Sequence, residues 1–464
     1  MAISTITFLG ATLTFTFGVV NAQSPFSIDT DEDIRRSAAL LAHDTTAFYT
    51  GNQTGQTPGI LPGPPPQGDY YWWQGGALWG TLMDYWFLTG DSSYNDVVMQ
   101  AMLFQVGENK DYQPRNVTAS LGNDDQAFWG MSAMLAAELN FPNPPSDQPQ
   151  WLALAQAVFN TQADPERHDN ECGGGLRWQI TRTNNGFDYK NTIANGCFFN
   201  MGARLARYTG NETYSKLAEE TWDWIQGVGY ITDEWDVYDG GHIGHNCTDI
   251  NKLQYSYNAA VLIQGAAFMW NITEDQIWKD RINGLVDRTI ELFFRDDGVA
   301  YEISCEPKYT CSTDMYSYKG YTHRWLAQSS QVAPFIRDKV MPILKSSAKG
   351  AISQCTGGDN GRECGFAWSS GKFDGKIGAG QEMSALAAVS SLLTDPSKGP
   401  VTADKGGTSK GDPNAGSHST DNLELRPITT ADRVGAGILT TLLLAGATGT
   451  FGWMIWEPSL NWRA

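Results

Sequence analysis

The stretch Gly122-Asn-Asp-Asp-Gln-Ala-Phe-Trp-Gly-Met-Ser-Ala-Met-Leu-Ala-Ala-Glu138 begins with polar residues and continues with small and apolar ones. This change predicts a loop that turns into a helix, with Asn123 as the N-cap and Gln126 three residues later, as in a capping box. Asp124 and Asp125 then stand in the first turn, where both side chains can lean into a cleft above the helix end. Most glycosidases break a glycosidic bond with two carboxyl groups that face each other across a cleft. The alternative is that the two charges only complement the helix dipole.

Five other segments repeat this pattern of a polar or aromatic start followed by small, apolar residues. They begin near Tyr70, Asn191, Gln254, Lys319 and Gly380, and with Asp124 included the starts lie 54, 67, 63, 65 and 61 residues apart. Between them the sequence is more charged and amphipathic, and we expect helices at residues 37–50, 94–106, 150–162, 214–226, 276–294 and 331–347.

The alternation of the two kinds of helix predicts the fold. A helix that is apolar on all sides is buried, whereas an amphipathic helix faces water on one side. Six inner and six outer helices in a repeat of this kind predict an all-α protein, an (α/α)6 barrel formed by residues 24–393. An open helical solenoid is the alternative, but small-residue runs such as Gly75-Gly76-Ala77 favour tight inner packing and closure.

If the barrel closes, the starts of its inner helices surround one cleft, and their polar clusters meet there. Aromatic faces stack on the C–H surface of sugars, and planar polar groups bind sugar hydroxyls. We therefore expect substrate contacts from Asp69, Tyr71, Trp72, Trp129, Lys190, Asn191, Asp239, Gln254, Tyr257, Lys319 and Gln381.

The two ends of the chain read as targeting signals. Residues 1–22 are almost uncharged and end in Val20-Asn21-Ala22, as in a secretory signal peptide, with a buried helix as the alternative. Residues 394–433 are rich in Gly, Ser, Thr, Pro, Asp and Lys, which predicts a disordered linker. The apolar tail at 434–464 suggests a GPI-anchor signal, with attachment at Asn414-Ala415-Gly416 or at Ser417 or Ser419. A single-span membrane anchor is the alternative.

The remaining composition agrees with a secreted protein that needs no cofactor. Seven cysteines in an oxidising compartment suggest disulfides. We expect the pairs Cys305–Cys311, Cys355–Cys364 and Cys172–Cys247, and a buried free thiol at Cys197, although spacing alone leaves the connectivity open. Five Asn-x-Thr sequons lie at Asn52, Asn116, Asn211, Asn246 and Asn271.

Several classes of function are disfavoured by the sequence. A net charge of −19 argues against nucleic-acid binding. The His242-x-x-His245 pair near Asp239 is a weak metal pattern, and the glycines at 240 and 241 favour a substrate loop there instead. No Cys-x-x-Cys and no Gly-x-Ser-x-Gly is present, so a zinc ribbon and a serine hydrolase lack support. We expect a monomer without metal or cofactor.

The segment at 122–138 strongly resembles the catalytic segment of glycoside hydrolase family 76, the endo-α-1,6-mannanases. Roughly residues 29–393 resemble the fungal cell-wall branch of that family, the DCW/DFG-type proteins; the segments Gly173–Trp178, Tyr189–Gly196, Trp235–Gly241 and Gly378–Leu386 also match. The resemblance implies an (α/α)6 fold and a retaining mechanism, with Asp124 as nucleophile and Asp125 as general acid/base. A helix N-terminus should keep Asp124 ionised, and the surroundings of Asp125 should raise its pKa.

Retaining chemistry needs carboxyl groups about 5–5.5 Å apart, which adjacent residues at a helix start can reach. The resemblance further implies α-mannoside substrates: mannan, which would be hydrolysed, or the glycan of a GPI anchor, which would be transferred to wall β-glucan. Both outcomes use the same carboxyl groups, so the motif does not separate them. A wall lectin on the same scaffold is the non-enzymatic alternative, and the intact pair argues against it.

Overall fold

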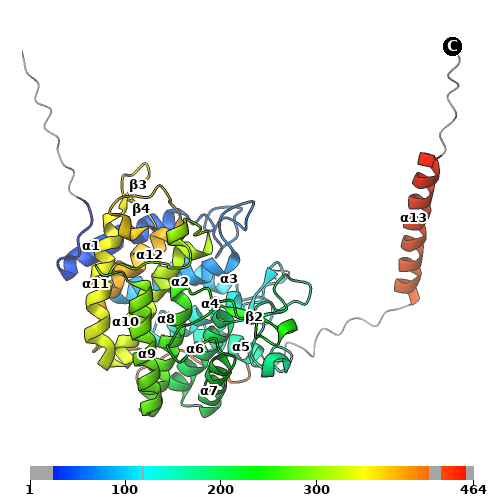
Figure 1. Cartoon of the computed structure of the whole chain (residues 1–464). Coiled ribbons are helices and arrows are strands. Elements are labelled where there is room, and N and C mark those ends of the chain that lie inside the picture. The colour runs from blue at the N-terminus through cyan, green and yellow to red at the C-terminus, as the bar shows by residue number, and fades with distance from the viewer. Residues whose placement is uncertain (1–23, 118–119, 417–429, 456–464) are drawn as a thin grey trace, which may run out of the picture. The chain divides into compact units, whose positions relative to one another are not determined.

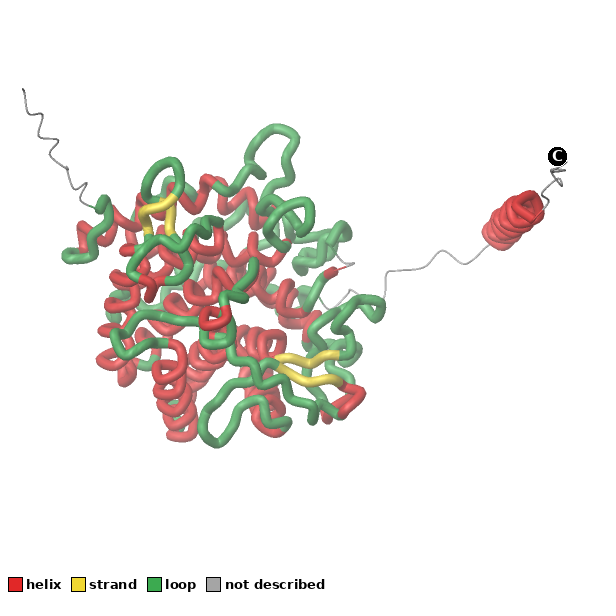
Figure 2. The backbone as a smooth tube through the Cα atoms, turned by 45° about the horizontal axis from the view of Figure 1, so that its top comes forward, coloured by secondary structure: helices red, strands yellow, loops and turns green. Residues whose placement is uncertain are grey.

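The computed structural model describes residues 24–117, 120–416 and 430–455. These residues divide into two compact units, one up to Gly416 and one after it. The first unit is built mainly of helices joined by long loops, and its two short sheets lie among these loops (Figures 1 and 2).

Six helices form a closed inner ring. They are α2 (Trp72–Thr89), α4 (Asn123–Glu138), α6 (Thr192–Thr209), α8 (Ser256–Thr273), α10 (Tyr318–Val332) and α12 (Ala379–Ser390). Each packs against the next in this order, and α12 packs against α2, which closes the ring. The predicted (α/α)6 barrel is therefore confirmed, and the open solenoid is not formed.

Six outer helices cover this ring. They are α1 (Asp31–Ala47), α3 (Asn95–Phe104), α5 (Trp151–Gln162), α7 (Glu212–Gly227), α9 (Gln276–Phe293) and α11 (Arg337–Ser353). Helix α7 is typical of them. It buries Tyr214, Ala218, Trp222 and Ile225 on one face, and on the other it exposes charged residues: Lys216, Glu219, Glu220 and Asp223.

The remaining elements are short. Strand β1 (Tyr189–Asn191) pairs antiparallel with β2 (Gly240–His242), and β3 (Cys355–Gly357) with β4 (Glu363–Cys364). Single 3₁₀ turns are η2 (Glu171–Gly173), η3 (Ile243–His245), η4 (Glu306–Lys308), η5 (Asp314–Ser317), η6 (Pro334–Ile336), η7 (Trp368–Ser370) and η8 (Ser391–Leu393).

Small residues bring the inner helices close together. A Cβ atom at Gly76 of α2 would lie 2.8 Å from the ring of Trp129 in α4, and one at Gly80 would lie 2.5 Å from the hydroxyl of Ser132. Only glycine permits this approach without moving α4. The glycines and alanines that suggested closure thus form the contact between neighbouring inner helices.

Three predicted helix boundaries are wrong. The first outer helix starts at Asp31 instead of residue 37, because Thr30 caps it by accepting from the Asp33 N–H. The N-cap of α4 is Gly122, not Asn123, and Asp125 rather than Gln126 returns a hydrogen bond to it: the Gly122 N–H donates to Asp125 Oδ2 at 2.7 Å. Gln126 is instead buried, where its amide donates to the Asp111 carbonyl at 2.7 Å. The last outer helix starts at Arg337 instead of residue 331, because α10 continues to Val332 and Pro334 then begins a separate turn.

The predicted disordered linker is also wrong for residues 394–416, which we call the C-terminal strap. The strap runs along the first unit, where the Val401 N–H donates to the Glu138 carbonyl at 2.9 Å and the Ala403 N–H to the Tyr208 carbonyl at 2.9 Å. Further along, the amide of Asn160 donates to the Ala415 carbonyl at 2.8 Å. Polar composition predicted disorder, but amide side chains on the barrel supply the hydrogen-bond partners that the polar backbone needs.

The second unit is a single helix, α13 (Thr430–Ile455). Residues Arg433–Gly452 within it are long and apolar enough to cross a membrane. The predicted signal peptide at 1–22 and the stretch 417–429 lie outside the described residues.

All three expected disulfides are present. Cys172 bonds to Cys247, Cys305 to Cys311 and Cys355 to Cys364, and Cys197 is a buried free cysteine, as predicted. The five sequon asparagines are all exposed, which glycosylation would require.

Candidate active site

The two adjacent aspartates at the start of α4 are held by different donors. Asp124 accepts a hydrogen bond on Oδ1 from the backbone N–H of Asp125 at 3.0 Å, and on Oδ2 from the indole N–H of Trp178 at 3.1 Å. Asp125 accepts from the Gly122 N–H, which draws its carboxyl group back over the helix start. A Cβ atom at position 122 would lie 2.3 Å from Asp124 Oδ1, so this arrangement requires glycine there.

Both carboxyl groups line a cavity of about 230 Å³ at the end of the barrel where the inner helices begin. Residues at the starts of α2, α4, α6, α8 and α10 line it, together with loop residues that precede these helices. The full lining is Trp73, Asp124, Asp125, Phe128, Trp178, Tyr189, Asn191, Ile193, Asp239, Tyr255, Tyr257, Asp314, Met315 and Tyr318. The predicted convergence of helix starts on one cleft is thus present for five of the six inner helices.

Aromatic rings make up much of the cavity wall. Tyr257 and Tyr318 stack face to face, with ring centroids 3.8 Å apart and an interplanar angle of 7°. Trp73 packs on Phe128, with centroids 4.6 Å apart. Apolar rings with a few polar groups between them are suited to a sugar, which offers both C–H faces and hydroxyls.

Burial controls the charge of the carboxyl pair. It raises the pKa of Asp125 to about 7, and it raises the pKa of Asp124 well above its usual range, where the nearby Asp125 carboxyl adds to the effect. Loss of hydration therefore opposes the ionisation of Asp124 that the helix N-terminus favours, and the hydrogen bonds to this group offset only part of the rise in its pKa. Two interacting carboxyl groups lose their protons in two steps that belong to the pair.

Two further carboxyl groups reach the same cavity. Asp239, which was predicted, accepts hydrogen bonds from the Tyr189 hydroxyl at 2.7 Å and the Asn251 amide at 3.1 Å, and burial raises its pKa. Asp314, which was not predicted, lies in η5 just before α10, and burial raises its pKa to about 6. No Lys, Arg or His is among the described residues that line the cavity.

Of the predicted substrate contacts, Asn191, Asp239 and Tyr257 line the cavity. Lys190 and Lys319 do not: both are buried in ion pairs, with Asp169 at 2.7 Å and Glu306 at 2.7 Å respectively. Their neighbours Tyr189 and Tyr318 face the cavity instead. Successive side chains of a strand point to opposite faces, and adjacent residues of a helix point in different directions, so the prediction selected the right segments and the wrong residues.

The other predicted contacts also lie away from the cavity. Trp129 is fully buried in the core and stacks on Trp72 with centroids 5.0 Å apart, while Trp73 faces the cavity. Gln254 hydrogen-bonds within its own loop, to the Val237 N–H and to Asp236. The remaining members of the predicted set are Gln381, which is buried near the start of α12, and Asp69 and Tyr71, which are exposed before α2.

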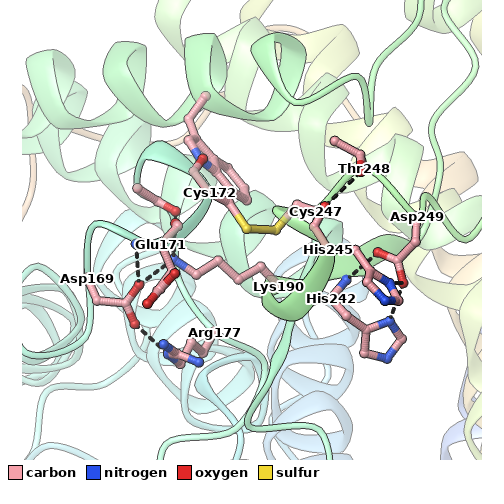
Figure 3. The surroundings of a disulfide bond; sticks show 12 residues. Asp169, Glu171, Cys172, Arg177, Lys190, His242, His245, Cys247, Thr248 and Asp249 are labelled. Carbon is pink, nitrogen blue, oxygen red and sulfur yellow. Dashed lines mark hydrogen bonds and ion pairs between the residues drawn. A yellow bond between two sulfur atoms is a disulfide. The ribbon is translucent and has the colours of Figure 1, made fainter.

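The loop with the predicted weak metal pattern is held by hydrogen bonds (Figure 3). Asp249 accepts from Nδ1 of His242 at 2.8 Å and lies 2.9 Å from Nδ1 of His245, and the backbone N–H of His242 and the two imidazoles hold its pKa well below the usual range. Among the described residues, no group of three or more His, Cys, Asp or Glu is placed to hold a metal ion. On the other side of the Cys172–Cys247 bond, Lys190 reaches Asp169.

Sequence reasoning missed Trp178, Tyr189, Asp314 and Tyr318 as cavity residues. Trp178 ends the segment Gly173–Trp178, which resembles the family, and that match is the one signal that could have pointed to it. Asp314 carried no recognisable signal, because it precedes its helix by several residues, in a 3₁₀ turn that follows the loop closed by the Cys305–Cys311 disulfide.

Comparison with known proteins assigns the family. The sequence profile of Glycosyl hydrolase family 76 matches residues 33–404. The chain is 43% identical over 97% of its length to mannan endo-1,6-alpha-mannosidase DCW1 of Eremothecium gossypii, covering 99% of that protein. It is 41% identical over 90% of its length to mannan endo-1,6-alpha-mannosidase DFG5 of Saccharomyces cerevisiae, covering 91% of it.

Comparison with solved structures agrees with this family assignment. The crystal structure of Dfg5 from Chaetomium thermophilum in complex with glucosamine is 61% identical and superposes with a TM-score of 0.83, covering 85% of this chain and 98% of that one. An inactive variant of an alpha-1,6-mannanase of Salegentibacter, in complex with alpha-1,6-mannotriose, shares the fold at 16% identity, with a TM-score of 0.61 over 78% of this chain and 99% of that one. The chain belongs to glycosyl hydrolase family 76.

Proposed function

We propose that this glycoside hydrolase is a retaining endo-α-1,6-mannosidase of the fungal cell wall that transfers the glycan of GPI-anchored mannoproteins to wall β-glucan. The observation that carries the proposal is the buried pair Asp124–Asp125, in a cavity whose other walls are largely aromatic. The relatives named as mannan endo-1,6-alpha-mannosidases support the choice of an α-mannoside.

In the first step, ionised Asp124 attacks the anomeric carbon of the mannosyl unit. The glycosidic C–O bond breaks as Asp125 gives its proton to the leaving oxygen, and a mannosyl ester of Asp124 forms. The Trp178 N–H and the Asp125 backbone N–H both point at the Asp124 carboxyl group, so they orient the nucleophile.

In the second step, Asp125 is a carboxylate and takes the proton of an incoming hydroxyl. That oxygen attacks the anomeric carbon, the ester bond breaks, and Asp124 is released with net retention of configuration. Water as the attacking group gives hydrolysis, and a sugar hydroxyl gives transfer.

The active form of the pair carries one proton. Burial and mutual repulsion raise the pKa of both groups above the ordinary carboxyl range, so this form is expected at higher pH than for an exposed pair of aspartates. It is lost at lower pH when both groups are protonated and at higher pH when neither is, which gives a bell-shaped rate profile.

Location supports transfer as the outcome. The signal at residues 1–22, the five exposed sequons and the apolar helix α13 favour a secreted, glycosylated protein held at the cell surface by a GPI anchor. There the enzyme would meet both GPI-linked mannoproteins and glucan. Hydrolysis of α-1,6-mannan is the second candidate, which the printed names of the relatives favour.

The test uses wild type, Asp124→Asn, Asp125→Asn and a control, Asp233→Asn, whose side chain is exposed and does not line the cavity. Each is incubated with a GPI-type mannoside donor, with and without a β-glucan oligosaccharide, and products are identified by mass. We expect a mannosyl–glucan product from wild type and control, and at least a 1000-fold loss in each active-site variant. Release of free mannoside only, in the presence of glucan, would favour the hydrolase; equal activity in all four proteins would exclude the carboxylate mechanism.

A further inference from the structure

Asp314 lines the cavity and carries a buried polar atom that has no partner among the described residues. Its Oδ1 is buried and accepts no hydrogen bond from any described residue, although the side chain lines the cavity between Met315 and the start of α10. Buried carboxyl oxygens are normally hydrogen-bonded, because burial strips them of water. An orphaned acceptor on a side chain that lines a cavity is therefore a group available to a ligand.

The Asp314 side chain does not hold the local backbone in place. The turn η5 is held by its backbone and by the Ser317 hydroxyl, which donates to the Asp314 carbonyl at 2.8 Å, and the Asp314 carboxyl group caps neither η5 nor α10. Trp73 hydrogen-bonds the carboxyl group and offsets part of the rise in its pKa. Oδ1 nevertheless has no partner among the described residues.

The character of the cavity defines what this oxygen accepts. Asp124, Asp125, Asp239 and Asp314 line it, and no cationic side chain among the described residues does. A phosphate or carboxylate on the ligand would face only like charges, whereas neutral hydroxyls donate to carboxylates without that penalty.

We propose that Asp314 is a specificity-determining residue whose free oxygen accepts a hydrogen bond from one hydroxyl of the mannosyl unit in the cavity. The inference rests on the proposed function, because it assumes that a mannosyl unit occupies this cavity. Asp314 accordingly selects an unsubstituted, uncharged sugar unit at the position next to the catalytic pair. Substituents such as phosphate belong on units outside the cavity.

The test is a double-mutant cycle between the residue and the substrate. The kcat/KM of wild type, Asp314→Asn, Asp314→Ala and the exposed control Asp233→Asn is measured on an α-1,6-mannotriose and on a series of its analogues that each lack one hydroxyl. In wild type and control, we expect one analogue to lose about 10- to 100-fold, the effect of a hydrogen bond to a charged acceptor. In Asp314→Ala that analogue and the parent sugar should react equally well.

Two further readouts separate this role from others. Asp314→Ala should change the melting temperature little, since it removes an unsatisfied acceptor and takes a partner only from Trp73, which borders the cavity; a large drop would indicate a structural role. In Asp314→Asn the alkaline limb of the rate profile should move to lower pH, because Asp314 is one of the groups that raise the pKa of Asp125. A shifted limb without any hydroxyl-specific coupling would overturn the proposal and leave Asp314 a purely electrostatic neighbour.

If the proposed function itself is wrong, the experiment gives a different result. If wild type leaves the mannotriose and a GPI-type mannoside unchanged, the same deoxy series is titrated by calorimetry against Asp124→Asn, which keeps the shape of the cavity. Equal binding of every analogue to that variant and to Asp124→Asn/Asp314→Ala would then reject the role of Asp314 independently of catalysis.

Discussion

Asp124 and Asp125 share one turn of helix, yet their carboxyl groups depend on different parts of the chain. Asp125 is bound by the residue that caps its own helix, whereas Asp124 is bound by Trp178, which lies 54 residues further on. The roles of the two groups are therefore separable by mutation of their partners. Trp178 is the clearer case, because its indole N–H is a single donor to a single oxygen.

Trp178→Phe should move the acid limb of the kcat/KM profile to higher pH and reduce the rate about tenfold at the optimum. The indole N–H favours the ionised form of Asp124, so its loss raises the pKa at which the pair gives up its first proton. The profile is recorded on mannotriose, with Trp224→Phe as the control, since Trp224 donates to the Cys172 carbonyl away from the cavity. An unchanged acid limb would show that this hydrogen bond does not tune the pair.

At the scale of elements, the sequence located every inner helix to within two residues of its observed start. It succeeded because the feature that begins an inner helix, a polar cluster followed by small apolar residues, is local. The prediction failed at Lys190 and Trp129. At both positions a shift of one residue along the chain decides whether a side chain faces the cavity or the core. Pairing of β1 with β2 sets this at Lys190, and packing between helices sets it at Trp129. Asp314 was missed because its loop is positioned by tertiary contacts.

The C-terminal strap was predicted to be disordered from its composition, but it is ordered. Residues elsewhere in the chain set its position. Asn140, Gln156 and Asn160 donate to or accept from its backbone, and Val401 pairs with the end of α4. The strap is therefore a part of the catalytic unit, in agreement with the family profile, which continues past Leu393 to residue 404.

Ending the secreted chain at Leu393 should lower its melting temperature by about 5–10 °C relative to a chain that ends at Gly416. The shorter chain loses the strap and exposes the Glu138 and Tyr208 carbonyls that it satisfies. Thermal unfolding of the two secreted forms measures the difference. Equal melting temperatures would mean that the cost of ordering the strap cancels its contacts.

On the scale of the whole molecule, the three disulfides close loops of very different length. Cys172–Cys247 joins residues 75 apart and ties the segment before α6 to the segment before α8, while the other two span 6 and 9 residues. Because the long loop restricts the unfolded chain most, its bond should contribute most to stability.

Cys172→Ala/Cys247→Ala should cost about 4 kcal/mol of unfolding free energy, and Cys305→Ala/Cys311→Ala about 2 kcal/mol. Denaturant unfolding of both double variants gives the two values. The first variant should also raise KM, because the segments that it frees carry the cavity residues Trp178, Tyr189 and Asp239. The opposite order of stabilities would show that native-state strain, and not loop length, dominates.

Closure of the inner ring by α12 against α2 also limits how this fold can diversify. An open repeat array can lengthen in evolution by duplicating a unit at one end. A closed ring offers no end, and a seventh hairpin would have to force apart an existing pair of packed helices. Change is therefore confined to the connections before the inner helices, where Trp178, Asp239 and Asp314 stand. Family members that use different glycans should accordingly differ in the length and content of these connections, while the number of helices stays the same.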